Sequence, residues 1–532
     1  MRAQMNPGVA EQRAPKRAPQ AGAKAVSLLR YSPALVAVVI ALADSARFTD
    51  PDLWWHLRSG QEILRLGHPL FYDPYSYTAH GHPWLNHEWL ADAIFAASYR
   101  LFGVFGLKLV KLACTAATIL FLSLALAETG ASALTQLGLL ILTALAIQPQ
   151  MQFRPQVFTF ALMSALVALL ARDTYRREGR LWIAIPILAL WANLHGGFLM
   201  GIVALAIYAG ISGVQDWRRA RGPSRGLQLG ALWCGALAAT LATPYGLETW
   251  RLLFHALTNP YTRNTLADWK PLWRAIGQSL SSPSGLINYV AAAALILGMG
   301  AACVLAAETI DVAMVVIAAT MAAAGVAAVR NLPLAVITAP APLAHHLALR
   351  ARRRVRDERA AAPRASRQSY LNQTVAALLA IFVLIETGFF SRSLRFDEPY
   401  PAGALAFMER HRLSGNLLCK YGWGGYVIYH ASPATRMFID PRFDTVYPER
   451  VIGDYLAFHF NLPRAKRALD DYPTQLVLIE PQMAGAALMA SLSGWTPVYR
   501  DRDSILYARA GSPASKLSDV PATGAVGAQE FP

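Results

Sequence analysis

Charged residues are scarce in this sequence. Asp, Glu, Lys and Arg together make up 15% of its 532 residues, whereas hydrophobic residues make up 55%. Because soluble proteins carry roughly a quarter charged residues, this composition argues against a soluble enzyme and indicates a membrane protein. Apolar runs recur along most of the chain, each long enough to cross a hydrocarbon core of about 30 Å.

Cysteine is scarce too, and basic residues do not gather into one face. The four cysteines lack metal-ligand spacing, which argues against a disulfide framework or a zinc motif. The formal charge is +16, but the basic residues lie in short segments between apolar runs. This distribution follows the positive-inside rule and argues against nucleic-acid binding.

The apolar runs predict a polytopic all-α bundle of about eleven transmembrane helices. All the strongly basic loops, at 172–180, 215–226 and 349–368, fall on one side of it. We therefore expect a cytoplasmic N-terminus in a bacterial inner membrane, with the C-terminal region in the periplasm. The predicted spans lie near 31–47, 106–127, 132–148, 156–171, 181–192, 197–213, 228–243, 285–306, 311–329, 333–349 and 371–390.

The chain divides into a transmembrane domain and a small soluble one. In the C-terminal part, "GALAFMERHRL" and "AKRALDDY" have helical periodicity, while "NLLCKYGWGGYVIYH", "RMFIDPRF" and "TQLVLIEP" resemble strands or short buried runs. "TPVYRDRDSILYAR" predicts a hairpin. Interleaved helices and strands indicate a small periplasmic α/β domain. The predicted division is a disordered cytoplasmic tail at 1–30, a transmembrane domain at 31–391 with a long first periplasmic loop at 48–105, the α/β domain at 392–510, and a disordered tail at 511–532.

The first loop opens with an unusually charged segment, "DPDLWWHLRSGQEILRLG". Asp50 suits an N-cap and Pro51 the first turn, so a helix should start there. Its pattern, with two tryptophans suited to the headgroup level, predicts an amphipathic helix on the membrane surface. Asp52 and His56 would be neighbours, four residues apart. These carboxylates could act as general base or metal ligand beside His56; the alternative is that Asp50 only caps and Asp52 only favours the helix dipole.

A second acidic motif, "LNHEW", follows in the same loop. Asn86 is another candidate cap, and it precedes His87 and Glu88 in a predicted first helical turn. Glu at a helix start is often only structural. Its occurrence beside His87, in a loop that already holds two acidic residues, favours a shared site. The spacing matches no metal signature.

Polar residues also mark the periplasmic ends of later spans. Arg154 and Arg330 end two spans, and Asn193 and His195 lie between two others. A membrane-edge arginine usually reaches the headgroups, but anionic lipids are mainly cytoplasmic. Because guanidinium presents a planar fork of donors, two arginines at one mouth would suit a lipid phosphate or pyrophosphate.

The α/β domain has its own dense motif at 420–444. Three glycines there allow close backbone approach, and Trp423 with Tyr421 and Tyr426 could form a recognition platform. Asp440 and Arg442 follow. The alternative is a glycine-bearing turn with a structural ion pair.

Together these motifs resemble the GT-C superfamily of integral-membrane glycosyltransferases, nearest to the catalytic subunits of oligosaccharyltransferases. "TDPDLWWHLR" resembles the Asp-Pro-aromatic stretch followed by arginine in the first loop of those subunits, which makes Arg58 a candidate for substrate binding. "YGWGGYVIYH" stands in the place of their WWDYG motif. Gly424 and Gly425 replace the Asp-Tyr of that motif, so recognition of an acceptor peptide does not carry over.

The resemblance implies transfer of a sugar or glycan from a polyprenyl-phosphate-linked donor to a periplasmic acceptor, which could be a glycan, a lipid or a protein. Asp50 or Asp52 would be the catalytic carboxylate, as base or as ligand of a divalent metal such as Mg²⁺ or Mn²⁺, with Glu88 or His87 completing the site. By location, Arg154 and Arg330 would hold the carrier phosphate.

Two other classes of function compete with this interpretation. A transporter or flippase would place ionisable groups near mid-membrane, whereas these spans are nearly free of charge. The other alternative is a non-catalytic assembly protein whose α/β domain binds a partner.

Overall fold

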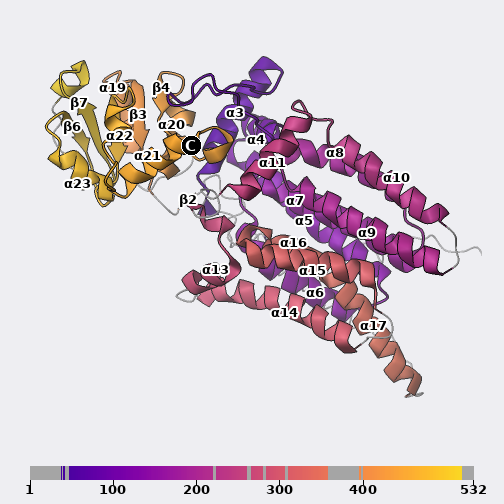
Figure 1. The fold of residues 1–532 in the computed structure, drawn as a ribbon. Coiled ribbons are helices and arrows are strands. Elements are labelled where there is room, and N and C mark those ends of the chain that lie inside the picture. Colours follow the sequence, from indigo (N-terminus) through magenta and orange to yellow (C-terminus); the bar gives the residue numbers. More distant parts are fainter. Residues whose placement is uncertain are drawn as a thin grey trace, which may run out of the picture.

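The computed structural model describes residues 37–38, 40–41, 47–48, 50–219, 223–259, 265–279, 283–305, 310–357, 395–396 and 399–517 of the chain. A helical bundle carries a smaller α/β domain at one end (Figure 1). The predicted tail at 1–30, the predicted span at 371–390 and most of the span at 31–47 lie outside the described residues.

Among the described residues, six helices are apolar and long enough to cross a membrane, by length and composition. They cover Val104–Glu128 (α5), Ala133–Gln150 (α6 Ala133–Ile147 with η1 Gln148–Gln150), Gln156–Arg176 (α7), Phe198–Arg218 (α9), Leu286–Leu305 (within α14, Pro283–Leu305) and Val329–Arg353 (η5 Val329–Asn331, α16 Leu332–Thr338 and α17 Pro340–Asp357). Two shorter apolar helices lie at Leu181–Leu194 (η2 Leu181–Ile183, α8 Ala184–Leu194) and Val312–Ala327 (α15). The chain is therefore a multi-pass membrane protein, and the count of about eleven spans remains a prediction.

Further helices complete the bundle. They are α3 (Asp52–Leu66), α4 (Trp89–Phe102), α10 (Ser224–Ala239), α11 (Leu247–Thr258), η3 (Ala267–Trp269) and α13 (Leu272–Ser279). A short parallel pair, β1 (Arg47–Phe48) with β2 (Arg395–Phe396), joins the beginning of the first loop to the beginning of the region predicted to form the α/β domain.

Ion pairs join several helices at the end of the bundle away from the α/β domain. Arg176 at the end of α7 contacts Glu128 at the end of α5 at 3.1 Å, and Arg225 in α10 contacts Asp216 in α9 at 2.9 Å. The arginine-rich end of α17 also points away from the α/β domain (Figure 1). The basic segments and the α/β domain thus occupy opposite ends of the bundle.

The α/β domain is built on a five-stranded sheet of order β4-β3-β5-β7-β6. Strands β3 (Gly415–Cys419), β4 (Thr435–Met437) and β5 (Leu476–Ile479) are parallel, while β6 (Trp495–Arg500) and β7 (Ile505–Arg509) run antiparallel as the predicted hairpin. The flanking elements are α19 (Ala402–Arg410), η6 (Tyr421–Trp423), α20 (Gly424–Ala431), η7 (Phe443–Thr445), α21 (Glu449–His459), α22 (Arg467–Asp470), α23 (Ala484–Ser491) and η8 (Pro513–Lys516).

The segment "GGYVIYH" is helical, whereas a strand or a short buried run was predicted for it. Helix α20 connects the parallel strands β3 and β4, a connection that usually requires a helical crossover. Gly425 lets this helix approach the beginning of α3. A Cβ atom there would lie 2.8 Å from the carbonyl oxygen of Pro51.

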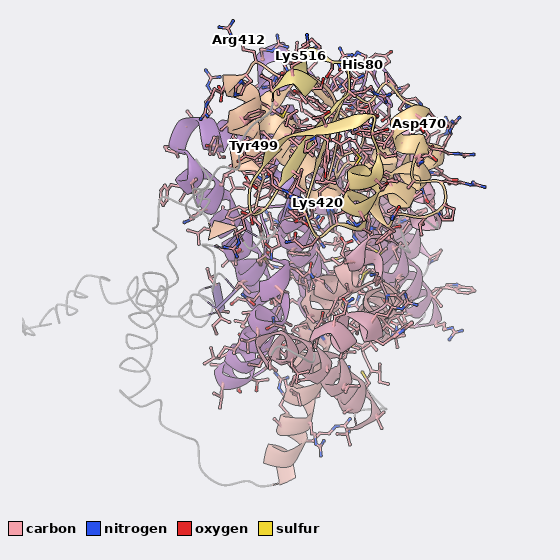
Figure 2. The ribbon with its side chains drawn as sticks, turned by 90° about the vertical axis from the view of Figure 1, so that its left-hand side faces the viewer. His80, Arg412, Lys420, Asp470, Tyr499 and Lys516 are labelled. Atoms are coloured by element: carbon pink, nitrogen blue, oxygen red, sulfur yellow. The ribbon has the colours of Figure 1, made fainter. Side chains whose placement is uncertain are left out.

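The first loop is part of the α/β domain's own core. Ser76 forms a parallel bridge to Met437, the last residue of β4, and the Met437 N–H donates to the Tyr75 carbonyl at 2.9 Å. One hydrophobic cluster contains residues of the first loop and of the domain together. Figure 2 shows His80 of the first loop at the same end of the molecule as Arg412 and Asp470 of the domain.

A fully buried arginine connects the first loop to the α/β domain. Arg442 donates to Asp440 in the domain and, at 2.7 Å, to Asp73 in the first loop. Its guanidinium also lies 4.6 Å from the ring centroid of Trp84 and 5.0 Å from that of Tyr75. The motif around Arg442 therefore contains the structural ion pair of its alternative interpretation, between Arg442 and Asp440. A second ion pair, with Asp73, joins two distant parts of the chain.

Helix α3 starts near the predicted position but does not present its tryptophans to lipid. The Asp52 N–H donates to Asp50 at 2.9 Å, as the capping prediction requires. Trp54 is fully buried, with its ring 4.9 Å from Tyr426 and 5.7 Å from Tyr400 of the α/β domain. The expectation that both tryptophans anchor a membrane-surface helix was wrong, because the domain and first loop cover that face.

Candidate functional site

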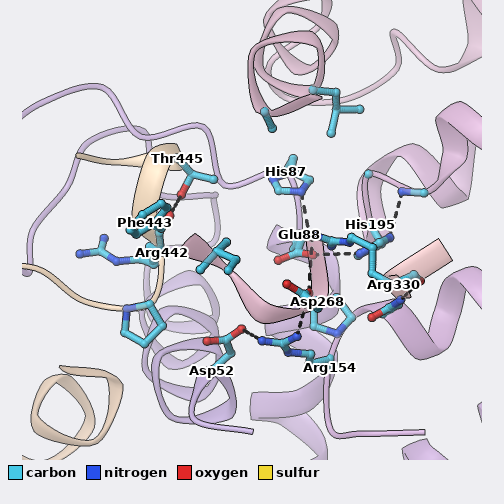
Figure 3. A pocket seen from close by; sticks show the side chains of 18 of the residues that line it. Asp52, His87, Glu88, Arg154, His195, Asp268, Arg330, Arg442, Phe443 and Thr445 are labelled. Atoms are coloured by element: carbon cyan, nitrogen blue, oxygen red, sulfur yellow. Dashed lines mark hydrogen bonds and ion pairs between the residues drawn. The ribbon is translucent and has the colours of Figure 1, made fainter. Parts of the chain in front are cut away.

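A cavity of about 430 Å³ lies where the bundle, the first loop and the α/β domain meet. This volume is in the range of small-molecule sites. Its walls come from the start of α3, the segment before α4, the near ends of α7, α9 and η5, helix α11, and the turns η6 and η7 of the domain. Figure 3 shows ionisable side chains from these separate elements converging on it.

Arg154 is the centre of an acidic cluster on one wall. Its guanidinium contacts the carboxylates of Asp50 and Asp52, and it lies 3.6 Å from Asp268. Arg154 precedes α7, whereas the two first-loop acids begin α3, so the contact joins the bundle to the loop. Burial raises the pKa of Asp50 to about 7, against the opposing effect of Arg154.

Arg330 lies next to this cluster and shares one of its carboxylates. Its Nη1 atom is 3.8 Å from Asp268, and its guanidinium lies 4.6 Å from the ring centroid of Trp269. The backbone N–H of Val329 donates to the Lys270 carbonyl at 3.0 Å, which ties the η3 turn to η5. Asp268 therefore bridges the two arginines from a position open to the cavity (Figure 3).

Glu88 occupies the other wall, between two histidines. Its Oε1 atom lies 3.5 Å from Nε2 of His195 and 3.9 Å from Nε2 of His87. Glu88 stands at the N-cap of α4 without making a side-chain capping bond, so its carboxylate is directed elsewhere. Burial, with Arg330 and His87 nearby, holds the pKa of His195 well below its ordinary value.

His56 is not the partner of Asp52, although the two are four residues apart on α3. Its Nδ1 atom lies 2.6 Å from Oδ1 of Asp92 in α4, and both side chains are buried. Burial disfavours the charged imidazole, but the carboxylates around it, Asp92 first and then Glu88 and Asp52, together outweigh burial and raise the pKa of His56. Asp52 instead contacts Arg154. The tertiary partners thus replace the expected helical pair.

Four residues expected to bind substrate make structural contacts away from the cavity walls. Arg58 donates to Glu62 on its own helix at 2.9 Å. Asn193 accepts from Trp89 at 3.0 Å and donates to two backbone carbonyls. Trp423 is buried and donates to the Pro399 carbonyl at 3.0 Å, while Tyr426 packs on Trp54.

The α/β domain reaches the cavity through one residue of the expected platform, Tyr421, and through a turn that follows Arg442. Tyr421 and the turn Phe443–Thr445 line the cavity. No sequence motif indicated Asp268 or Asp92. Asp268 contacts Arg154 and Arg330, and Asp92 contacts His56, and all of these partners are too distant in the sequence for a spacing pattern to reveal the contact. The only signal for Asp268 is its place in a Trp-rich polar segment between apolar runs.

The carboxylates do not fit a divalent cation as they are arranged. Among the residues that the structure describes, no group of three or more His, Cys, Asp and Glu side chains could hold a metal ion. Arg154 takes the position between Asp50, Asp52 and Asp268 that a shared cation would need. These acids are therefore arranged around a guanidinium.

Comparison with solved structures identifies the architecture. The archaeal oligosaccharyltransferase AglB from Archaeoglobus fulgidus, in complex with an inhibitory peptide and a dolichol-phosphate, superposes with a TM-score of 0.56 at 12% identity, covering 87% of this chain and 71% of that one. The Archaeoglobus fulgidus oligosaccharyltransferase in the apo form gives 0.51 at 12% identity, covering 93% and 75%. The fold is of the GT-C type.

A third structure, ArnT from Cupriavidus metallidurans in the apo state, gives a TM-score of 0.46 at 15% identity, covering 94% of this chain and 100% of that one. No protein-family model and no curated protein sequence matches the chain. The GT-C-type architecture, a many-helix membrane bundle with a small α/β domain, agrees with the fold expected from the sequence.

Proposed function

We propose that this protein is a membrane glycosyltransferase that moves a sugar from a polyprenyl-phosphate-linked donor to an acceptor in the cavity. The observation that carries the proposal is the arginine pair. Arg154 precedes α7 and Arg330 lies in η5, yet both contact one carboxylate, Asp268, at the cavity wall. Two guanidinium groups around one anion are suited to a phosphate.

The chemistry follows from what such a transfer needs. The acceptor oxygen or nitrogen attacks the anomeric carbon, and the bond from that carbon to the phosphate oxygen breaks. The departing phosphate gains negative charge, which fixed guanidinium groups stabilise. A carboxylate in the cavity accepts the acceptor's proton. Asp52 and Glu88 are the candidates, and Asp50 and Asp52 also fix the orientation of Arg154.

The fold supports the class of donor and leaves the acceptor open. AglB was solved with a dolichol-phosphate, a polyprenyl-type carrier, and with a peptide. We infer a carrier of the same chemical class here. The acceptor would enter beside Tyr421, Phe443 and Thr445, where the α/β domain lines the cavity.

The direct test uses protein purified in lipid nanodiscs with undecaprenyl-phosphate-linked glucose, mannose and 4-amino-4-deoxyarabinose, each labelled in the sugar. A mixture of cell-envelope glycans, lipids and proteins is supplied as acceptor. We expect at least one donor to release undecaprenyl phosphate, with no release by Arg154→Ala. Arg251→Ala, an exposed arginine paired with Glu248 outside the cavity, is the matched control.

Two results would contradict the proposal. One is binding of none of these donors, nor of undecaprenyl phosphate. The other is movement of intact labelled lipid across proteoliposomes without cleavage, which would support the flippase alternative.

We further propose that the end of the bundle with the α/β domain faces the periplasm of a bacterial inner membrane. A cysteine in place of exposed Asp470 should react with a membrane-impermeant maleimide in intact spheroplasts. A cysteine in place of exposed Glu178, in the basic segment at the other end, should react only after lysis. The reverse pattern would show the opposite orientation.

A further inference from the structure

A chain of hydrogen bonds runs from Trp191 through Thr159 to His195. The indole N–H of Trp191 donates to the Thr159 hydroxyl oxygen at 2.8 Å, and the same oxygen lies 2.8 Å from Nδ1 of His195. Indole is a donor only. Since the hydroxyl oxygen already accepts from it, the hydroxyl proton is free to point to His195, whose Nδ1 then accepts.

A second donor reaches the same ring nitrogen. The backbone N–H of Gly197 lies 2.9 Å from Nδ1 of His195, and a backbone N–H can only donate. The approach requires glycine, because a Cβ at this position would lie 2.5 Å from the Thr159 hydroxyl oxygen. Both contacts therefore assign the lone pair of His195 to Nδ1.

The proton of His195 must then be on Nε2, the atom that faces the cavity. There it lies 3.5 Å from Glu88. The other ionisable groups around His195 are His87 and His56 from the first loop and the two arginines, Arg154 and Arg330. Protonating Nδ1 as well would set an N–H against two donors. Together with burial, this lowers the pKa of His195 and keeps the ring neutral.

We propose that His195 is a positioning residue held in one neutral tautomer, and that its Nε2–H orients Glu88 as the base for the acceptor. This rests on the proposed function. Asp52 is less suited to the task because Arg154 donates into its carboxylate. Within the part of the chain that the structure describes, Glu88 makes no ion pair with a guanidinium, and its neighbours are two imidazoles.

The step balances without a further reactant. The acceptor X–H gives its proton to Glu88 while X forms the bond to the anomeric carbon. The bond between that carbon and the carrier's phosphate oxygen breaks, and its electron pair leaves with the phosphate between Arg154 and Arg330. Glu88 returns the proton to water. The Nε2–H of His195 stays directed at Glu88 throughout, and His195 exchanges no proton.

The tautomer can be tested without any substrate. ¹⁵N-histidine-labelled protein in nanodiscs, compared with His195→Gln to assign the signal, should show His195 neutral and protonated only at Nε2 from pH 5 to pH 8. Thr159→Val should weaken this restriction, whereas Thr159→Ser should preserve it. A signal in which His195 gains a second proton near the ordinary pKa of about 6.5, or carries its proton on Nδ1, would overturn the inference.

Kinetics test the role of Glu88. Glu88→Gln should lower kcat for undecaprenyl phosphate release by about a hundredfold or more while leaving undecaprenyl phosphate binding intact. His195→Ala should lower kcat about tenfold, and His195→Gln, which keeps a donor near the Nε2 position, should restore most of it with a pH profile like that of the wild type.

The two proposals fail in different ways. If the wild-type protein turns over and the Glu88→Gln variant is equally active, Glu88 is not the base. The glycosyltransferase proposal would still stand in that case. A protein that binds neither undecaprenyl phosphate nor any linked donor would overturn the proposed function, while the histidine signals would still decide the tautomer.

Discussion

The two walls of the cavity hold their carboxylates in opposite ways. On the arginine wall, Asp50, Asp52 and Asp268 surround Arg154. On the imidazole wall, Glu88 lies between His87 and His195. The first arrangement places its acids around a permanent cation, whereas the second places its acid beside two imidazole rings. We therefore propose that the arginine wall binds the carrier phosphate and that Glu88 on the imidazole wall accepts the acceptor's proton.

Breaking the arginine wall at its centre should have the largest effect. Arg154→Ala leaves Asp50 and Asp52 without their cation and removes a phosphate ligand, so we expect turnover to fall by about a thousandfold, as for the loss of a preorganised electrostatic contact. The measurement is undecaprenyl phosphate release. Arg154→Lys should recover only part of it, because ammonium cannot reproduce the planar fork. Equal activity of the Lys variant and the wild type would contradict the bidentate role.

Removing one charge from that wall should have a smaller effect. Asp52→Asn keeps the shape of the side chain but no longer holds Arg154, and we expect about a hundredfold loss in kcat with intact folding. Glu248→Gln, which removes a carboxylate outside the cavity, should behave as wild type. Full activity of Asp52→Asn would exclude it from the reaction and strengthen the assignment of Glu88.

The support beneath the imidazole wall can be tested through stability. Asp92→Asn breaks the buried pair with His56 and should lower the free energy of unfolding by about 3 kcal/mol. Asp92 also accepts from Asn86, next to His87, at 2.8 Å. Because the pKa of His56 is raised, the pair's contribution is complete below pH 6.5 and is lost as the pH rises through the folded-state pKa.

Thermal unfolding in detergent measures this difference. The gap between wild type and Asp92→Asn should narrow from pH 6 to pH 9, whereas exposed Asp470→Asn should show no gap at either pH. A gap that widens with pH would show that His56 is neutral in the folded protein.

The smallest expected effect concerns the boundary between the walls. Asp268 bridges Arg154 and Arg330, where the carrier phosphate is proposed to bind. Asp268→Asn removes a competing anion, so undecaprenyl phosphate should bind about threefold more tightly, with the gain reduced at high salt. Weaker binding would instead show that Asp268 is needed to orient the arginines.

Several elements follow from local sequence alone. The helix after Asp50 and Pro51, the hairpin at 495–509 and the long apolar helices begin and end close to where capping, alternation and hydropathy indicate. These signals involve neighbours within a few residues, so one sequence is enough to interpret them. "GGYVIYH" misled because a buried helix and a buried strand can share the same short apolar run.

The partners of the polar residues were less predictable. Spacing suggested Asp52 with His56, but the contacts are Asp52 with Arg154 and His56 with Asp92, across 102 and 36 residues. Trp423 and Tyr426, expected to bind substrate, belong to the hydrophobic cluster that the α/β domain shares with the first loop, and Tyr426 packs on Trp54, more than 300 residues earlier in the chain. A single sequence does not show which residues far apart along the chain are in contact in the folded protein.

The sequence by itself determined that this chain is a membrane bundle with a small α/β domain, and that its polar motifs share one end. Hydropathy, basic loops and periodicity are properties of each segment and need no partner. Only the tertiary structure decided which acid meets an arginine and which meets an imidazole. That choice depends on how the first loop enters the core of the α/β domain and where the ends of α7, α9 and η5 then lie around it.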